Sequence, residues 1–160
     1  MRYWIILLSF FILSCSDLSP ESSSDNPKVQ RIDSLFVAEI RSDEMQMAVD
    51  DSSLITLWAF IEKESPENPI VNLKVNNFSA RVDSLIFLIS RGQVVKCPNF
   101  ILPSDSVQNQ FWYVLRPDEL RRMSQADILP FRIIGDRPAE GVIDPGALAM
   151  MRQFYAELIK

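Results

Sequence analysis

Three consecutive aromatic residues, Phe111-Trp112-Tyr113, form the densest aromatic run in the sequence. If the run is a β-strand, alternate side chains point to opposite faces, so Trp112 lies opposite Phe111 and Tyr113. An aromatic side chain on an exposed face could bind a sugar, a peptide or a partner protein. The structural alternative is a core position on one face and an edge position on the other. We take Trp112 and Tyr113 as candidate binding residues.

A group of arginines makes the second half of the chain locally basic. Its members are Arg116, Arg121, Arg122, Arg132 and Arg137. Guanidinium groups form paired hydrogen bonds with carboxylates and phosphates, so the group could receive an anionic ligand or an acidic partner. The simpler alternative is a solvated surface with ion pairs. Arg121 and Arg122 join the candidate binding residues.

Cys97 follows Lys96 and is the one cysteine outside the first 15 residues. A thiolate nucleophile needs a base or a nearby positive charge, and the chain has no histidine. Lys96 or an arginine would have to take that role. The expected alternative is a buried cysteine at a strand end that packs as a small apolar residue.

The acidic pairs Asp43-Glu44 and Asp50-Asp51 are the densest carboxylates. They lack the glycine and the regular spacing of a calcium loop, so we expect solvated turn residues. No spacing marks a pair of carboxylates for general acid and base catalysis. We therefore predict that the protein is not an enzyme, and we assign no catalytic residue, no metal site and no cofactor.

Composition excludes several further classes of protein. The 160 residues include 16 Lys+Arg and 21 Asp+Glu, a net charge of −5, whereas a nucleic-acid-binding protein has a basic footprint. Nucleic acid is therefore not an expected partner. The absence of histidine excludes a Ser-His-Asp triad and a His-ligated metal. Only four glycines occur, and neither G-x-G-x-x-G nor a Walker A motif is present.

The amino terminus carries the most specific motif. Met1-Arg2 precede an apolar run from Tyr3 to Leu13. As a helix this run spans about 16 Å, roughly half of a bilayer core, so it is typical of the apolar region of a secretory signal. Ile12-Leu13-Ser14-Cys15 follows and resembles the lipobox of bacterial lipoproteins. A plain secretory signal and an uncleaved anchor are the alternatives.

The resemblance implies that Cys15 is lipidated and becomes the first residue of the mature protein. Three acyl chains exceed what stable membrane anchoring requires. Residues 1–14 are then a signal peptide, residues 15–27 the lipidated cysteine and a disordered tether rich in serine and acids, and residues 28–160 a single domain. Ser16 after the cysteine resembles the Gram-negative pattern for delivery to the outer membrane, on its periplasmic or surface face. The expected partners are the membrane, through the acyl chains, and possibly another envelope protein.

The rest of the chain predicts strands first, and helices only in its second half. Leu54–Ile61 is apolar and rich in β-branched and aromatic residues, which favours a strand, although a helix has the same near-continuous pattern. The other predicted strands are Ile32–Ile40, Met45–Val49, Ile70–Val75, Val82–Ile89, Val94–Cys97, Phe111–Leu115 and Leu129–Ile134.

Two helices are predicted from their start signals. Pro117 begins one, and Asp144-Pro145 begins the last, as N-cap and first helical residue. The last helix has an apolar face at helical spacing, expected to pack on a core. Its members are Leu148, Met151, Tyr155 and Leu158.

These elements predict an α+β fold, with a largely antiparallel sheet and two helices from the C-terminal half packed on one face. The second half resembles that of small bacterial envelope lipoproteins, a resemblance that implies fold but carries no known site. The expected function is a lipid-anchored cell-envelope protein that binds or scaffolds without catalysis, because the envelope location and an apolar patch around Phe111–Tyr113 or Trp58 favour contact with another molecule. The alternatives are a small envelope hydrolase that uses carboxylates and a structural subunit of an outer-membrane assembly.

Overall fold

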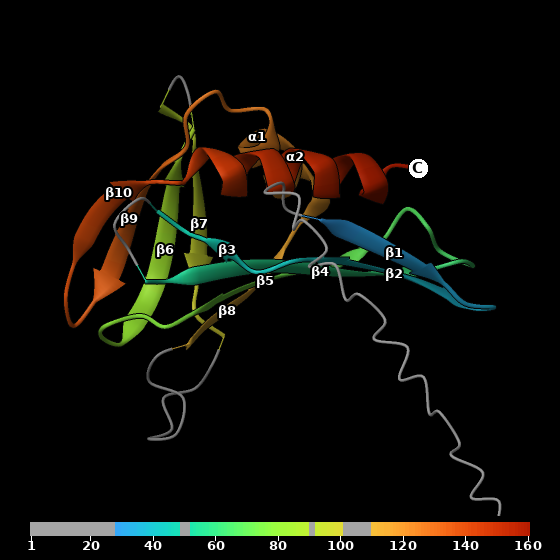
Figure 1. Ribbon diagram of the computed structural model, residues 1–160, viewed down its shortest axis with the longest axis horizontal. Helices are drawn as coiled ribbons and strands as arrows, with labels where there is room; N and C mark the ends of the chain where they lie inside the picture. Colours follow the sequence, from blue (N-terminus) through green and yellow to red (C-terminus); the bar gives the residue numbers. More distant parts are fainter. Residues whose placement is uncertain (1–27, 49–51, 90–91, 101–109) are drawn as a thin grey trace, which may run out of the picture.

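The computed structural model describes residues 28–48, 52–89, 92–100 and 110–160. The predicted signal, lipidation site and tether lie outside the described residues. The described part is an α+β fold in which every strand pairing is antiparallel and both helices belong to the C-terminal half. The predicted fold class is confirmed, with the strands divided between two sheets (Figure 1).

The large sheet has the strand order β1-β2-β4-β5-β8, and β3 also pairs with β4. Its strands are β1 (Val29–Asp33), β2 (Val37–Ser42), β3 (Met45–Gln46), β4 (Leu54–Glu62), β5 (Ile70–Asn76) and β8 (Gln110–Leu115). The small sheet has the order β10-β9-β6-β7. Its strands are β6 (Val82–Leu88), β7 (Val94–Pro98), β9 (Pro130–Gly135) and β10 (Ala139–Val142). The helices are α1 (Pro117–Ser124) and α2 (Pro145–Leu158).

Strand β4 shows why the large sheet has two different faces. Ile55, Leu57, Ala59 and Ile61 are buried, whereas the residues between them are only half-buried. This period of two excludes the helical alternative for this segment. Both helices lie on one side of the large sheet (Figure 1), and α2 contacts β1, β2, β3 and β4. We call the side with the buried residues the covered face and the opposite side the open face.

Helix α2 closes the core, as the sequence predicts. Asp144 caps it, because its Oδ1 accepts hydrogen bonds from the backbone N–H groups of Gly146 (2.7 Å) and Ala147 (3.3 Å). Phe154 is fully buried and Tyr155 half-buried. The buried side of the helix consists of Ala147, Leu148, Met150, Met151, Phe154 and Leu158. The terminal helix therefore packs on the core of its own domain.

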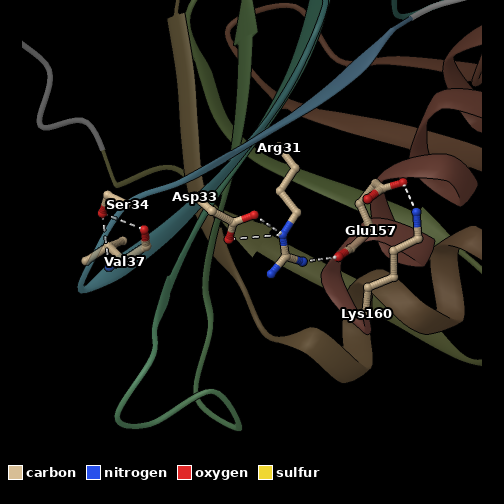
Figure 2. A network of polar contacts seen from close by, with 6 residues as sticks. All are labelled: Arg31, Asp33, Ser34, Val37, Glu157 and Lys160. Atoms are coloured by element: carbon tan, nitrogen blue, oxygen red, sulfur yellow. Dashed lines mark hydrogen bonds and ion pairs between the residues drawn. The ribbon is translucent and has the colours of Figure 1, made fainter.

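An arginine on the edge strand fixes the far end of α2. Arg31 Nη1 donates to the backbone oxygen of Glu157 at 2.9 Å, and its Nε lies 3.3 Å from Asp33 (Figure 2). A cation at a helix C-terminus satisfies a free carbonyl and complements the helix dipole. The contact joins β1 to residues 126 positions later in the chain.

Backbone hydrogen bonds join the two sheets at two places. Phe100 N–H donates to the Trp112 oxygen at 2.8 Å, so the chain after β7 continues along β8. At the other end, Ala48 forms a bridge with Ile143, and Asp144 N–H donates to the Met47 oxygen at 2.9 Å. The core is thus enclosed by the two sheets and by α2.

Two strand predictions are wrong in their extent. The predicted single strand Ile32–Ile40 is a β-hairpin, because the Ser34 side chain accepts from Val37 N–H and donates to its carbonyl, which turns the chain (Figure 2). The predicted strand Met45–Val49 is reduced to the two residues of β3, followed by the bridge at Ala48; Val49 lies outside the described residues.

Strand β10 was not predicted at all. Its sequence, Ala-Glu-Gly-Val, lacks a clear alternation of apolar and polar residues. It is held by its antiparallel pairing with β9, which places Gly141 opposite Phe131. No helix in the described ranges is long and apolar enough to cross a bilayer.

Candidate functional site

The structure does not bring the four predicted binding residues together. Trp112 belongs to the open face of β8, and Tyr113 belongs to the opposite, covered face. Arg121 and Arg122 are on α1, which lies on the covered side (Figure 1). The prediction that Trp112 points away from Phe111 and Tyr113 is confirmed. A single site made of all four residues is not.

Tyr113 is half-buried at the edge of the core. Its ring stacks on Phe100 with centroids 5.5 Å apart and an interplanar angle of 9°. Burial, and then the negative charge of Glu119, raise the pKa of the Tyr113 hydroxyl above its usual value. Glu119 is itself held by Arg116, whose N–H and Nη2 each lie 2.9 Å from its carboxylate. The contacts between Arg116 and Glu119 form a capping box at the start of helix α1. Tyr113 packs beside this helix start and Phe100, which indicates a structural role.

The two arginines of α1 differ from each other. Arg122 forms an ion pair with Asp118 one helical turn earlier, at 3.2 Å. Arg121 is exposed beside a hollow of about 660 Å³ between the helices and the β4–β5 turn. Acidic Glu67 and Asp118 line the same hollow, so its charges are mixed.

The open face carries both tryptophans of the described chain, and the sequence candidates include only one of them. Strand register places Trp58 of β4 opposite Asn72 of β5, and places Lys74, two residues further along β5, opposite Trp112 of β8. One strand therefore separates the two indoles. Trp58 lies in an apolar run in which the sequence predicts a strand and an apolar patch, but nothing local to it signals that β5 joins it to β8.

A cleft of about 290 Å³ lies between the two indoles. Its lining residues are Arg41, Ser42, Thr56, Leu57, Trp58, Asn72, Lys74 and Trp112. Three of the four strands that meet here, β2, β4 and β5, are interior strands of the sheet, so the floor of the cleft is rigid backbone.

Hydrogen bonds fix the orientation of both indoles. Trp58 Nε1 donates to Glu39 at 2.7 Å, and Trp112 Nε1 donates to Asn72 Oδ1 at 3.3 Å. Asn72 Nδ2 in turn lies 3.4 Å from the backbone oxygen of Trp58. Asn72 is thus a positioning residue that links the two sides of the cleft. Rings held in this way are preorganised for a ligand.

Each indole has a cation over its ring. The guanidinium carbon of Arg41 lies 5.0 Å from the Trp58 centroid, and Lys74 Nζ lies 5.8 Å from the Trp112 centroid. Arg41 also forms an ion pair with Glu39. Within the described ranges, Lys74 has no carboxylate partner. The cleft therefore has a net positive charge in a protein whose net charge is −5.

Apolar side chains extend the open face beyond the cleft. Phe60 lies 4.6 Å from Trp58 between ring centroids. Opposite it is Ile70, which is 52% exposed, and Val114 on β8 is 41% exposed. The exposed side of an antiparallel sheet is usually polar, so this aromatic and aliphatic surface is unusual.

A third hollow, of about 530 Å³, lies between β9, β10 and the start of α2. Its lining is mainly apolar, with Asp127, Glu140 and Arg152 as the charged groups. Glu140 forms an ion pair with Arg132 at 2.6 Å, and Arg152 donates to the backbone oxygens of Ser124 and Ala126. Most of its charged groups already have partners within the fold.

Cys97 is buried, which agrees with the packing alternative. Burial, and then the charge of Glu119, raise the pKa of its thiol far above the usual value. Burial and the raised pKa both disfavour the thiolate form that a cysteine nucleophile requires. Among the described residues, no group of three or more histidine, cysteine or acidic side chains could hold a metal ion.

No family model, no curated protein and no solved structure matches this chain. Of the three hollows, the cleft on the open face combines oriented aromatic rings with a cation that lacks a carboxylate partner in the described residues.

Proposed function

We propose that the protein is a non-catalytic, lipid-anchored binding module of the cell envelope, with the open face of the large sheet as its ligand face. The observation that carries the proposal is the pair of hydrogen-bonded indoles, Trp58 and Trp112, on either side of a cleft. Ligand sites are typically concave, mainly apolar and aromatic, with a few placed polar groups, and this cleft has that composition.

The absence of a catalytic role is supported by how the reactive groups of the described chain are used. The Cys97 thiol is buried. Two of the hollows have acidic lining residues. In each hollow an arginine forms an ion pair with one of these acids: Arg122 with Asp118, and Arg132 with Glu140. These ion pairs favour a binding module over a hydrolase that uses carboxylates.

Lipid anchoring is supported by the lipobox resemblance at Ile12–Cys15. The tether from Ser16 to Pro27 reaches at most about 40 Å when extended, and it leads directly to β1 at the edge of the large sheet. The expected location is the outer membrane, on its periplasmic or surface face, with the membrane itself as the first partner.

The lipid anchor is tested by Cys15→Ser. The variant should appear in the soluble fraction or remain as an unprocessed precursor, because it cannot be acylated. Cys97→Ser is the matched control and should stay with the membrane. Retention of a processed Cys15→Ser protein in the membrane fraction contradicts the anchor.

The ligand face is tested through tryptophan fluorescence. The chain has three tryptophans, Trp4, Trp58 and Trp112, and removal of residues 1–14 leaves only the two that flank the cleft. Titration of the processed protein with glycan, lipid and protein pools of solubilised envelopes should give a saturable fluorescence change with one pool. Trp58→Phe and Trp112→Phe assign the change to each ring. A saturating pool that leaves both rings unaffected contradicts the proposed face.

A second candidate, a subunit of a membrane assembly, is favoured by the tip of the β1–β2 hairpin. Leu35 and Phe36 are 79% and 68% exposed there. The double variant Leu35→Ser, Phe36→Ser should release the protein from a large complex on native gels if this role holds. An unchanged complex, or none in the wild type, removes this candidate.

A further inference from the structure

The geometry points to an acidic saccharide as the ligand of the cleft: a sugar ring that carries a carboxylate, with its ring against Trp112 or Trp58 and its carboxylate at Lys74. This inference rests on the proposed function and names the ligand class for the same face. Three observations support it: the size and lining of the cleft, the polar groups Thr56 and Lys74 within it, and the pairing of the strands beneath it.

The ring is favoured by the size and lining of the cleft. At about 290 Å³ it lies at the lower limit of the roughly 300–1,000 Å³ typical of ligand pockets, so it holds one ring rather than a folded segment. Indole faces attract the polarised C–H groups of a sugar, because the face of the ring is electron-rich. Both indoles are already oriented by Glu39 and Asn72, which lowers the entropic cost of binding.

Two polar groups of the cleft suit an acidic sugar, and one of them, Lys74, lies over the Trp112 ring. Within the described residues, the Thr56 hydroxyl has no hydrogen-bond partner and Lys74 has no carboxylate partner, and both line the cleft. A hydroxyl both donates and accepts, which suits the hydroxyl groups of a sugar. The ammonium of Lys74 would accept a carboxylate in a charge-assisted hydrogen bond.

An extended peptide is a poorer fit to this surface. Peptides that bind sheets add a strand at an edge, where backbone N–H and C=O groups are free. Trp58 lies on β4, which is paired on both sides, with β2 and β5, and the backbone of β5 is likewise paired with β4 and β8. Of the strands at the cleft only β8 is an edge strand, and at Trp112 its backbone is already bonded, because Phe100 N–H donates to the Trp112 oxygen and Trp112 N–H donates to Asn99 Oδ1. At the cleft the open face therefore offers side chains, and the specificity comes from rings, a hydroxyl and a cation.

The test compares two probes that share the same sugar rings and differ in whether their carboxyl groups are charged. Trigalacturonic acid and its fully methyl-esterified form have the same rings, but only the acid has carboxylates. We expect the processed wild-type protein to bind the acid at least about tenfold more tightly in calorimetric titrations, since a hydrogen bond between two charged groups is stronger than one to a neutral ester. Raising the salt concentration from about 0.05 M to about 0.5 M should weaken binding of the acid and leave the ester unchanged.

Three variants separate the contributions. Lys74→Gln should remove most of the preference for the acid, so that the ratio of the two affinities falls toward one. Trp112→Ala should weaken both probes by up to about tenfold. Lys96→Gln, which changes an exposed lysine on β7 of the small sheet, is the matched control and should change neither affinity.

Four outcomes overturn the inference. They are equal affinity for acid and ester, no binding of either probe, an unchanged preference in Lys74→Gln, and an acidic peptide that binds the cleft as tightly as the acid. Each of these leaves the proposed function standing if an envelope pool still changes the fluorescence of Trp58 and Trp112. Failure of that separate titration contradicts the proposed function itself.

Discussion

The two faces of the large sheet are made by alternate residues of the same strands, yet they have opposite roles. On the covered face, Leu57 and Leu73 are opposite each other and completely buried. One residue away on each strand, Trp58 and Asn72 are opposite each other on the open face, where their polar atoms are hydrogen-bonded to side chains and to the sheet. The comparison shows that the pleat of the strand places core packing on one face and the proposed ligand contacts on the other.

The difference also explains which types of residue occur on each face. The covered face is almost entirely apolar, because it is packed against α2 and the rest of the core, where an unpaired polar group would be costly. The open face has side chains with an apolar body and a polar end, such as tryptophan and lysine, which can remain partly in water and still contact an apolar surface. Substitutions on the two faces should therefore give separable effects.

The largest effect is expected at the helix that covers the sheet. Phe154→Ala should lower the free energy of unfolding by about 3–5 kcal/mol, because it leaves a cavity at a fully buried position between α2 and the core. Gln153→Ala, at the exposed neighbouring position, should change it by less than about 0.5 kcal/mol. Denaturant unfolding measures both. A Phe154→Ala protein with unchanged stability but a lost partner would make α2 an interface.

The next effect compares adjacent residues of β4. Leu57→Ala should cost about 2–5 kcal/mol, as for other buried leucines, whereas Thr56→Ala on the open face should cost well under about 1 kcal/mol. Thermal unfolding of the two variants under identical conditions gives the difference. If Thr56→Ala is as destabilising as Leu57→Ala, the open face is buried in the protein as it exists, and the comparison fails.

A smaller effect on stability is expected from Cys97, a buried residue of β7 in the small sheet. Its usual pKa is 9.0 and burial raises the value in the folded protein. Above about pH 9 the unfolded chain therefore releases a proton that the folded chain keeps, so stability should fall by about 1.4 kcal/mol per pH unit. Below this window the contribution is fully present. Urea unfolding between pH 7.5 and pH 10 should show the loss in the wild type and a flatter profile in Cys97→Ala.

The smallest effect compares Tyr113 with its neighbour Trp112 on the opposite face. Glu119→Gln removes the negative charge that helps to raise the pKa of Tyr113, so this pKa should move down toward its usual value of 10.0, although burial still raises it. Spectrophotometric titration of the tyrosines detects the shift. The fluorescence of Trp112 should be unaffected, because the two side chains lie on opposite faces. A change in both signals would show that the faces are not independent.

Local patterns in the sequence determined most of the strands and the two helix starts of this protein. The apolar, β-branched and aromatic residues of Leu54–Ile61 favoured a strand, the period of a strand placed Trp112 opposite Phe111 and Tyr113, and Asp144-Pro145 predicted the start of α2. These features depend on neighbours within a few residues, because strand alternation and helix capping are properties of the local backbone. The hairpin at Ser34 was missed because a polar side chain that turns the chain gives a weaker signal than glycine or proline.

Only the tertiary structure decided which strands are neighbours, and with that the site. The sequence does not reveal that β8 pairs with β5 rather than with β7, its predecessor in the chain. That pairing places Trp112 diagonally across Asn72 from Trp58, 54 positions earlier, and beside Lys74. The strand order is the one that buries the whole covered face against α2 and the small sheet. Its stability comes from many contacts between residues that are far apart in the chain. The side chains of the open face are brought together as a consequence of this strand order. No local sequence pattern therefore predicts the cleft.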